Sequence, residues 1–297
     1  MAGARSWPVL ALLYLLALLL AVFILAPFAW VLSASFQPEH AIFKQPPDWL
    51  PRPLSLDNYV YVFTGKVPFK TDLSSGITAG ITGEAVFIPG ALRNTLMIAL
   101  AVMVLNLLFG TVTAYTFARE RFRGRGLAFN FILGSRLLPP MAVAIPIYTI
   151  LRVTGLLDSR LGLVLVHGAF TLPFSIWVLT LYFRGLPPEI EEAALVDGCG
   201  RLGALRHVVL PIAAPGLAAV AAFAFLFSYN EFLFAQLTLS SIEAKTIPVL
   251  IAAISVNPDA TYTLIAVGVV LAILAPILLA LVFRRYIVSG LVTSLEK

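Results

Sequence analysis

The residues that could support metal or redox chemistry are few in this sequence and lie far apart. Its 297 residues include one cysteine, Cys199, which excludes an internal disulfide. The three histidines, His40, His167 and His207, do not have the spacing of metal ligands. The sequence therefore predicts no metal site and no cofactor in this chain. A membrane enzyme or redox subunit is disfavoured, because it would need haem-ligating or zinc-ligating motifs.

Charged and amide side chains inside apolar segments are the other residues that could do chemistry. Arg136 interrupts residues 127–151, and Asn230 and Glu231 stand at the end of residues 208–230. A charge in a bilayer core costs several kcal/mol, so Arg136 should face a cavity, a partner chain or a counter-charge. We therefore predict that Arg136, Asn230 and Glu231 belong to a translocation pathway.

Structural roles remain open for the same three residues. Arg136 could instead bind carbonyl groups that Pro139 and Pro140 free in the helix. Asn230 and Glu231 could anchor a helix end at the membrane interface. In straight helices rising ~1.5 Å per residue, Arg136 would lie about 14 Å and Glu231 about 24 Å from the same face. This difference disfavours a direct pair between them.

The composition identifies the elements that must position these side chains. Hydrophobic residues make up 60% and charged residues 12% of the chain, against about 25% charged in soluble domains. A bilayer core needs roughly 20 apolar residues in a helix, so we predict an all-α membrane protein with six transmembrane helices. Asn106 and His167 are expected to form hydrogen bonds between helices. The predicted spans are residues 9–32, 94–118, 127–151, 161–183, 208–230 and 260–283.

The distribution of basic residues predicts the orientation. With six spans, both termini and the loops 119–126 and 184–207 share one side, which carries eleven lysines and arginines against eight on the other. Short basic loops stay in the cytoplasm, so both termini are predicted to be cytoplasmic. The net charge of +5 then reflects membrane topology rather than nucleic-acid binding. The first span is predicted to be retained, since it exceeds the roughly 7–15 apolar residues of a signal peptide.

The loop between the fourth and fifth spans, residues 184–211, is unusually well specified for a connection. Two prolines and three glutamates within residues 187–192 predict the start of a helix, and Gly198 predicts its end. A second short helix after Gly200 is expected to run into the fifth span. A helix lying on lipid headgroups is the alternative, but such helices favour basic residues, whereas residues 189–198 hold four acids and no base. We therefore predict a helix that docks to a partner protein.

A spaced motif occupies this loop. A Glu-Ala-Ala triplet is followed after three residues by glycine, and after nine more by a β-branched residue, one further residue and a Leu-Pro pair. This spacing resembles the EAA motif of permease subunits of bacterial ATP-binding-cassette (ABC) importers, with valine in place of the usual isoleucine. The segments 155–158, 172–175 and 229–232 resemble the maltose-type sugar permeases in particular, with Tyr229 where tryptophan is usual. The motif residues are Glu192, Ala193, Ala194, Gly198, Val208, Leu210 and Pro211.

The resemblance implies that the permease chain forms the membrane spans and that a separate chain hydrolyses ATP. In such importers the EAA loop forms a coupling helix that docks into a cleft of a separate ATPase subunit, whose ATP-driven closure produces alternating access. This sequence lacks the Gly-x-x-x-x-Gly-Lys-Ser/Thr motif, so the chain is expected to be non-catalytic, with ATP and magnesium bound by its partners. The coupling residues implied are Glu192, Ala193, Ala194, Asp197, Gly198, Leu210 and Pro211.

The resemblance also implies partners and a domain plan. The partners are two ATPase subunits, a second homologous permease in a heterodimer, an extracytoplasmic solute-binding protein and the bilayer, and no nucleic acid. The external loop 238–259 is a candidate contact for the solute-binding protein through residues 245–248, with a plain connector as the alternative. The predicted segments are an N-terminal helix (1–33), a proline-rich extracytoplasmic segment with little continuous helix (34–90), a five-helix permease domain (91–284) and a cytoplasmic tail (285–297).

The function implied is import of a carbohydrate, either a mono- or oligosaccharide or a polyol, across a bacterial or archaeal cytoplasmic membrane. A permease for another small solute, such as glycerol phosphate, is an alternative within the same class. An ion-coupled secondary transporter is a second class, in which Arg136 and Glu231 would be the relay residues. That class leaves the EAA loop unexplained.

Overall fold

Helices form all the regular structure of the residues described by the computed structural model, which are 7–52, 54–66, 83–257 and 261–295, with side chains up to residue 284. This described part contains no β-strand, which confirms the predicted all-α fold. Two π-helical turns, Asn106–Gly110 and Leu205–Val209, and two 3₁₀ turns, Gly83–Phe87 and Ser135–Leu137, interrupt or extend the α-helices. The α-helices are α1 (Trp7–Ser35), α2 (Glu39–Ile42), α3 (Asp57–Thr64), α4 (Ile88–Leu105), α5 (Thr111–Arg119), α6 (Arg125–Gly134), α7 (Pro140–Val153), α8 (Arg160–Arg184), α9 (Glu189–Val196), α10 (Arg201–Ala204), α11 (Leu210–Ile212), α12 (Ala214–Tyr229), α13 (Leu233–Thr238), α14 (Ile247–Ser255) and α15 (Tyr262–Leu295).

All six predicted spans correspond to helical segments. α1, the helix over Gly83–Arg119, α8 and the Tyr262–Arg284 part of α15 are each long and apolar enough to cross a membrane. The remaining two spans are bent pairs, α6 with α7 and α10–α11 with α12. The described residues therefore offer four helices that could each cross a membrane, or six spans if each bent pair forms one.

Proline accounts for both breaks. α6, with its 3₁₀ extension, and α7 meet at 99°. Leu138 between them is extended, with ψ 119°, because a following proline disfavours helical backbone. α11 and α12 meet at 81° around Ala213, and Pro215 lies in the first turn of the new helix, which begins at Ala214. The disturbance that Pro139 and Pro140 predict just beyond Arg136 is thus a sharp bend within residues 127–151. The short helix after Gly200 continues into the fifth span as far as Ile212, and that span then bends at Ala213.

The chain divides into two compact units, which are described separately. The first comprises residues 1–89 and 251–272, and the second comprises residues 90–250 and 273–297. The predicted plan of N-terminal helix, proline-rich segment, permease domain and tail stays a prediction. α15 continues as helix to Leu295, so helix extends into the segment predicted as a tail.

In the first unit, two side-chain amides, buried Gln37 and half-buried Asn58, hold the proline-rich segment together. Gln37 Nε2 donates hydrogen bonds to Ser33 Oγ and to the Asp48 carbonyl, both at 2.9 Å. Asn58 Nδ2 donates to the carbonyls of Ser35 and Gln37 at 3.0 and 2.9 Å. These bonds join the end of α1 to the turns that follow it. The short helices α2 and α3 confirm that prolines interrupt helix in this segment.

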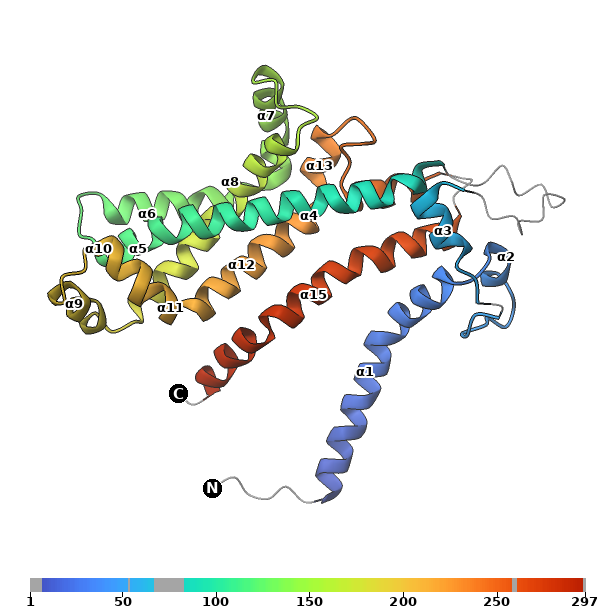
Figure 1. Ribbon diagram of the computed structural model, residues 1–297, viewed down its shortest axis with the longest axis horizontal. Helices are drawn as coiled ribbons and strands as arrows, with labels where there is room; N and C mark the ends of the chain where they lie inside the picture. The colour runs from blue at the N-terminus through green and yellow to red at the C-terminus, as the bar shows by residue number, and fades with distance from the viewer. Residues whose placement is uncertain (1–6, 53, 67–82, 258–260, 296–297) are drawn as a thin grey trace. The chain divides into compact units, whose positions relative to one another are not determined.

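In the second unit, α5, α8 and α12 pack side by side (Figure 1). Leu179 and Phe183 on α8 are fully buried in this packing. A polar network crosses the same bundle, because Asn106 Nδ2 donates to Thr171 Oγ1 and Ser175 Oγ donates to Asn106 Oδ1, both at 2.7 Å. The expected helix-to-helix hydrogen bonding of Asn106 is thus confirmed, and it fixes α8 against the π-helical turn that precedes α5.

Contacts between loops define the two ends of the second unit. At one end, the last residue of α5 joins α9 through the ion pair Arg119–Glu191. At the other end, Asn94 near the start of α4 donates from Nδ2 to the Glu243 carbonyl, which precedes α14, at 2.7 Å. The four spans of this unit therefore alternate in direction, as predicted. Which end faces the cytoplasm stays a prediction from the basic residues.

Helix occupies part of the predicted external loop 238–259. α13 ends at Thr238, and α14 covers nine residues from Ile247. The Ile247 backbone N–H donates to Thr95 Oγ1 at 2.8 Å, and Thr95 is buried on α4. Hydrogen bonds thus fix residues 243–247 of this segment to α4, while its contact with a solute-binding protein, like the alternative of a plain connector, stays a prediction.

Candidate functional site

α9 begins and ends as the sequence predicts. Its first turn carries three glutamates, where negative charge is favoured by the helix dipole. Gly198 follows the helix with φ +87°, a conformation that costs any residue with a Cβ. Gly198 N donates to the Leu195 carbonyl at 3.1 Å, and Cys199 N donates to the Ala194 carbonyl at 3.0 Å. This pair of bonds is the Schellman arrangement, so the glycine defines where the helix stops.

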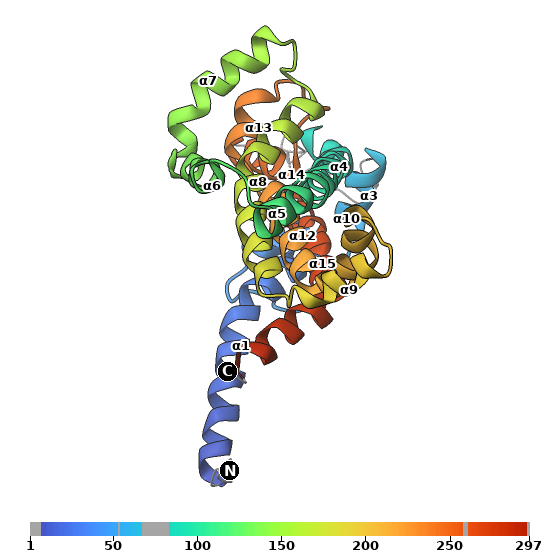
Figure 2. The same ribbon diagram turned by 90° about the vertical axis from the view of Figure 1, so that its left-hand side faces the viewer.

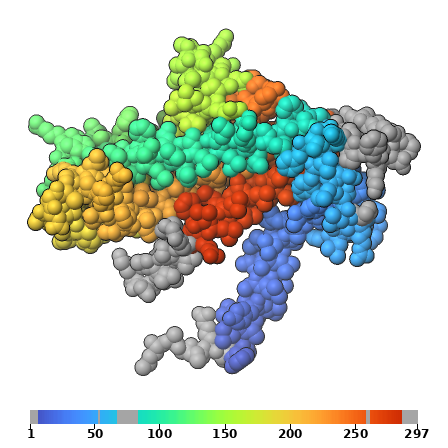
Figure 3. Space-filling view, in the orientation of Figure 1, coloured from blue at the N-terminus to red at the C-terminus, as the bar shows by residue number. Residues whose placement is uncertain are grey.

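One face of α9 presents most of the implied coupling residues. Glu192, Ala193, Asp197 and Gly198 are exposed, and Val196 is 87% exposed. α9 and α10, drawn in gold, lie uncovered at one end of the second unit in Figure 3. The small alanine and glycine side chains leave room for another backbone to approach. This surface therefore combines acidic charge with small side chains that permit close approach.

The opposite face of α9 is fixed to α5 through Glu191, which the sequence analysis did not single out. Ala194 and Glu191, three residues apart, are 7% and 8% exposed. One Glu191 carboxylate oxygen accepts a hydrogen bond from the Tyr115 hydroxyl, and the other lies 2.9 Å from Arg119 Nε. Arg119 also donates to the Leu186 carbonyl at 3.1 Å. The helical spacing that puts Glu191 on the face of Ala194 was the available signal.

The remaining motif residues lie at the junction with the fifth span. Glu120 forms an ion pair with Arg201, which joins the α5–α6 loop to α10. Leu210 is half-buried and Pro211 is exposed, both on α11, immediately before the bend at Ala213. The motif residues thus lie in two separate places, the exposed face of α9 and the turn that leads into α12.

Arg136 lies on the 3₁₀ turn where α6 gives way to α7, which projects away from the bundle of α5, α8 and α12 (Figure 2). Its guanidinium carbon is 5.3 Å from the ring centre of Phe174 on α8 and 5.8 Å from that of Phe223 on α12. The two ring centres are 4.0 Å apart. Cation–π attraction stabilises a guanidinium in such a place, while the residue keeps an exposed surface. The structure thus brings Arg136 to the aromatic rings of two other spans.

Glu231 pairs with His167 instead of Arg136. His167 Nε2 lies 3.0 Å from a Glu231 carboxylate oxygen, and His167 Nδ1 lies 2.8 Å from Ser228 Oγ. The side chains of His167 and Glu231 are 1% and 9% exposed. Glu231 also accepts two backbone N–H bonds from the first turn of α13, at 2.8 and 3.1 Å. Asn230 is exposed and donates to a carbonyl of its own helix. The expected helix-to-helix role of His167 is confirmed.

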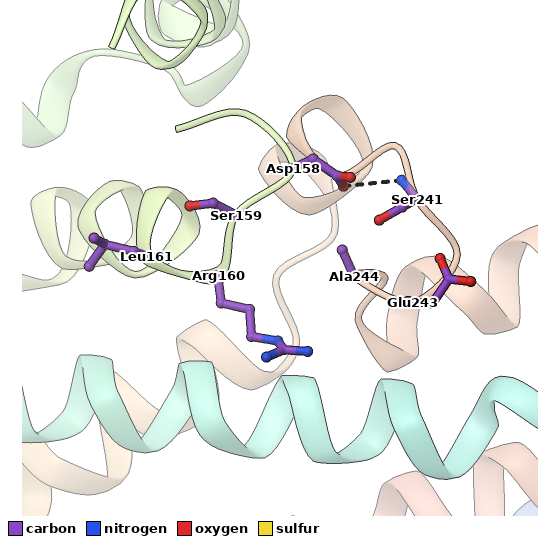
Figure 4. A pocket seen from close by; sticks show the side chains of 7 residues that line it. All are labelled: Asp158, Ser159, Arg160, Leu161, Ser241, Glu243 and Ala244. Carbon is purple, nitrogen blue, oxygen red and sulfur yellow. Dashed lines mark hydrogen bonds between the residues drawn. The ribbon is translucent and has the colours of Figure 1, made fainter. Parts of the chain in front are cut away.

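A pocket of about 400 Å³ lies at the opposite end of the second unit, beside the α7–α8 loop and the segment before α14. Asp158 Oδ1 accepts hydrogen bonds from the backbone N–H groups of Ser240 and Ser241 at 2.9 and 3.1 Å. Figure 4 shows the Asp158 carboxylate turned toward Ser241, with Arg160 pointing away from both. Glu243 supplies a further acid to the lining. Asp158 thus clamps two loops together at the rim.

The charge state of this clamp follows from its hydrogen bonds. Partial burial opposes charge on Asp158, but the bonds from Ser241 and Ser240 outweigh it and hold the pKa of this carboxyl below its usual range. When folding lowers the pKa of a carboxyl, its charged form stabilises the folded state. This stabilisation is complete above the ordinary pKa, about 3.9, and is lost as pH falls through the lowered pKa. The clamp is therefore expected to hold at neutral pH, with no change between pH 6 and pH 8.

Replacing Asp158 with glycine is expected to release Ser240 and Ser241 while keeping the positive φ of +55° accessible. The matched variant Asp158→Asn tolerates the same backbone conformation and retains an acceptor oxygen. Hydrogen exchange at pH 7 should be about tenfold faster at both serine amides in Asp158→Gly and close to wild type in Asp158→Asn. Equal exchange in wild type and Asp158→Gly would show that the carboxylate does not hold the loop.

Sequence comparison identifies relatives over most of the chain. The family described as binding-protein-dependent transport system inner membrane component matches residues 106–292. The trehalose/maltose transport system permease protein MalG of Thermococcus litoralis is 30% identical over 287 residues, which cover 95% of this chain and 94% of that protein. The trehalose transport system permease protein SugB of Mycobacterium tuberculosis is 31% identical over 275 residues, 92% of each chain.

Structural comparison agrees with the expected fold. A crystal structure of a bacterial ABC transporter involved in the import of the acidic polysaccharide alginate superimposes with a TM-score of 0.76 at 22% identity, covering 96% of this chain and 99% of the other. The resemblance to maltose-type sugar permeases that residues 155–158, 172–175 and 229–232 indicated is confirmed by the relatives. The chain therefore belongs to the inner membrane components of binding-protein-dependent transport systems, as a multi-pass ABC importer permease.

Proposed function

We propose that this chain imports a carbohydrate, as one of two permease subunits in an ATP-driven complex. The observation that carries the proposal is the exposed EAA face of α9, which is held to the end of a membrane span on its other side. The two relatives named above, whose names refer to trehalose and maltose, support a disaccharide as the first substrate to test. A second permease, which would complete the pathway as a heterodimer, is part of the proposal.

The proposed source of energy is a pair of separate ATPase subunits, which bind ATP and magnesium. The coupling contacts are assigned to Glu192, Ala193, Asp197 and Gly198 on the exposed side of α9. Ala194 packs beneath this surface, and Leu210 and Pro211 sit where a displacement of the loop would bend the entry to α12. An extracytoplasmic solute-binding protein would deliver the sugar at the end of the unit that carries Asp158.

The proposed pathway includes Arg136 and Asn230. Arg136 keeps an exposed surface within a bent span, where contact with lipid would be costly, and Asn230 is exposed at the end of α12. Glu231 is proposed to shape the pathway indirectly, because its bonds to His167 and to α13 fix the break after α12. Guanidinium and amide groups can donate hydrogen bonds to sugar hydroxyls during passage.

Replacing Arg136 with alanine is expected to reduce sugar uptake roughly tenfold, because a charged donor in the pathway contributes about 1.5–3 kcal/mol when it hydrogen-bonds. Uptake of labelled sugar by proteoliposomes that hold the complete complex measures this directly. Arg152→Ala is the matched control, since Arg152 is exposed near the end of α7, beyond the break. Equal rates and equal sugar preference in Arg136→Ala and wild type would remove Arg136 from the pathway.

The proposed function is tested with the purified complex in proteoliposomes. ATP with the solute-binding protein should drive accumulation of labelled trehalose or maltose, and omission of either should abolish it. Uptake driven by a proton or sodium gradient without ATP would contradict the proposal and support a secondary transporter. ATP-driven uptake of a polyol or a glycerol phosphate but of neither disaccharide would correct the substrate class and leave the importer mechanism intact.

A further inference from the structure

We propose that Glu191 is a positioning residue, which fastens the coupling helix α9 to the membrane span that ends at α5 and makes the two move together. This inference rests on the proposed function, since it assigns the route by which a displacement of α9 would reach the spans. Glu191 directly precedes the Glu192 of the EAA motif, so two adjacent acids would have different tasks. Glu192 lies on the exposed face, and Glu191 lies on the buried face.

The contacts of Glu191 fix α9 to α5. Both carboxylate oxygens are used, one by the Tyr115 hydroxyl and the other by Arg119 Nε at 2.9 Å. Tyr115 and Arg119 are one helical turn apart on α5, so the carboxylate is held at two points along that helix. Arg119 also bonds the Leu186 carbonyl, which lies before α9. A lateral displacement of α9 would therefore have to carry the end of α5 with it or break charged hydrogen bonds.

Among the contacts described at this end of the unit, the hydrogen bonds of Glu191 are the ones that join a side chain of α9 to α5. The second ion pair, Glu120 with Arg201, joins the α5–α6 loop to α10, beyond the glycine that ends α9. Arg184 donates to the Phe117 carbonyl at 3.4 Å from the end of α8, before α9 begins. Ala194 contributes packing on the same buried face but offers no directional bond from its side chain. The link between the side chains of α9 and α5 can therefore be removed by changing one carboxylate.

The inference is tested by separating coupling from assembly. In proteoliposomes with the full complex, Glu191→Gln should lower the sugar imported per ATP hydrolysed about fivefold, while the amount of assembled complex stays at the wild-type level. The reversed pair Glu191→Arg with Arg119→Glu should restore at least half of the ratio, because it rebuilds the ion pair. Glu189→Gln, the same change of an exposed acid two residues earlier on α9, serves as the control and should have the wild-type ratio.

A second measurement needs no sugar and so distinguishes this inference from the proposed function. Spin labels on Val112→Cys and Leu195→Cys in a Cys199→Ser background report the distance between α5 and α9, and both side chains are exposed. The distance distribution in the assembled complex should be narrow, broaden in Glu191→Gln and narrow again in the reversed pair. An unchanged distribution in Glu191→Gln overturns the inference even if uptake works as proposed. Equal losses of uptake, ATPase activity and complex abundance also overturn it, because they indicate a role in folding alone.

Discussion

Replacing Gly198 with arginine is expected to abolish ATP-driven uptake and to leave the chain in the membrane. Gly198 has φ +87°, so a side chain there costs roughly 1–2 kcal/mol at the end of α9 and weakens the Schellman bonds. A Cβ at this position would meet no other atom within 4 Å, so the remainder of the fold has no reason to collapse. The new charge instead projects from the surface assigned to the ATPase, where like-charge contacts or desolvation cost several kcal/mol.

Gly200 provides the matched control for this substitution. It also has no atom within 4 Å of an added Cβ, but its φ of −68° is ordinary for any residue. Gly200→Arg should therefore retain more than half of the uptake, whereas Gly198→Arg should lose at least ~90%, which corresponds to about 1.4 kcal/mol of coupling. Uptake, ATPase activity and membrane abundance should be measured on the same preparations. Normal uptake in Gly198→Arg would contradict the coupling role.

Replacing Glu231 with leucine is expected to cause the largest loss of stability among the residues considered. His167 would lose its carboxylate partner, and two backbone N–H groups at the start of α13 would lose their acceptor. Leaving buried donors unsatisfied costs ~1–3 kcal/mol each, so a total of about 3 kcal/mol or more is expected. Such a loss lowers Tm by on the order of 10 °C for a domain of this size.

Asn230 is the control for the stability measurement, because it is adjacent, exposed and bonded to a carbonyl of its own helix. Asn230→Leu should change the stability by less than about 0.5 kcal/mol, as exposed substitutions do. Thermal unfolding of the detergent-solubilised complex, followed by intrinsic fluorescence, separates the two variants. A Tm for Glu231→Leu within a degree of the wild-type value would show that the His167 contact contributes little.

Features that depend on local sequence could be predicted well. The end of α9 was predictable because only glycine adopts its backbone conformation without cost, and the start was predictable from acids at the helix dipole. The spans were predictable from their lack of charge. Asn106 and His167 bond neighbouring helices as expected, because an amide or imidazole inside a span needs a partner.

Features that depend on which helices meet could not be predicted from one sequence. Predicting the 99° break after Arg136 would have required knowing where α7 packs, because proline in a span can either kink or end a helix. Three acids begin α9, and helical spacing places Glu191 on the face of Ala194 but does not identify Arg119 as its partner. The pairing of Glu231 with His167 likewise depends on the register between α8 and the end of α12.

The exposed face of α9 is proposed to transmit ATP-driven motion from a separate ATPase. Photocrosslinking from two adjacent positions tests this proposal most directly, because Ala193 is exposed and Ala194 is 7% exposed. A photoreactive residue in place of Ala193 should crosslink the co-purified ATPase subunit, and the same residue in place of Ala194 should react within this chain. A crosslink from Ala193 to lipid or to the second permease, with none to an ATPase, would contradict the account.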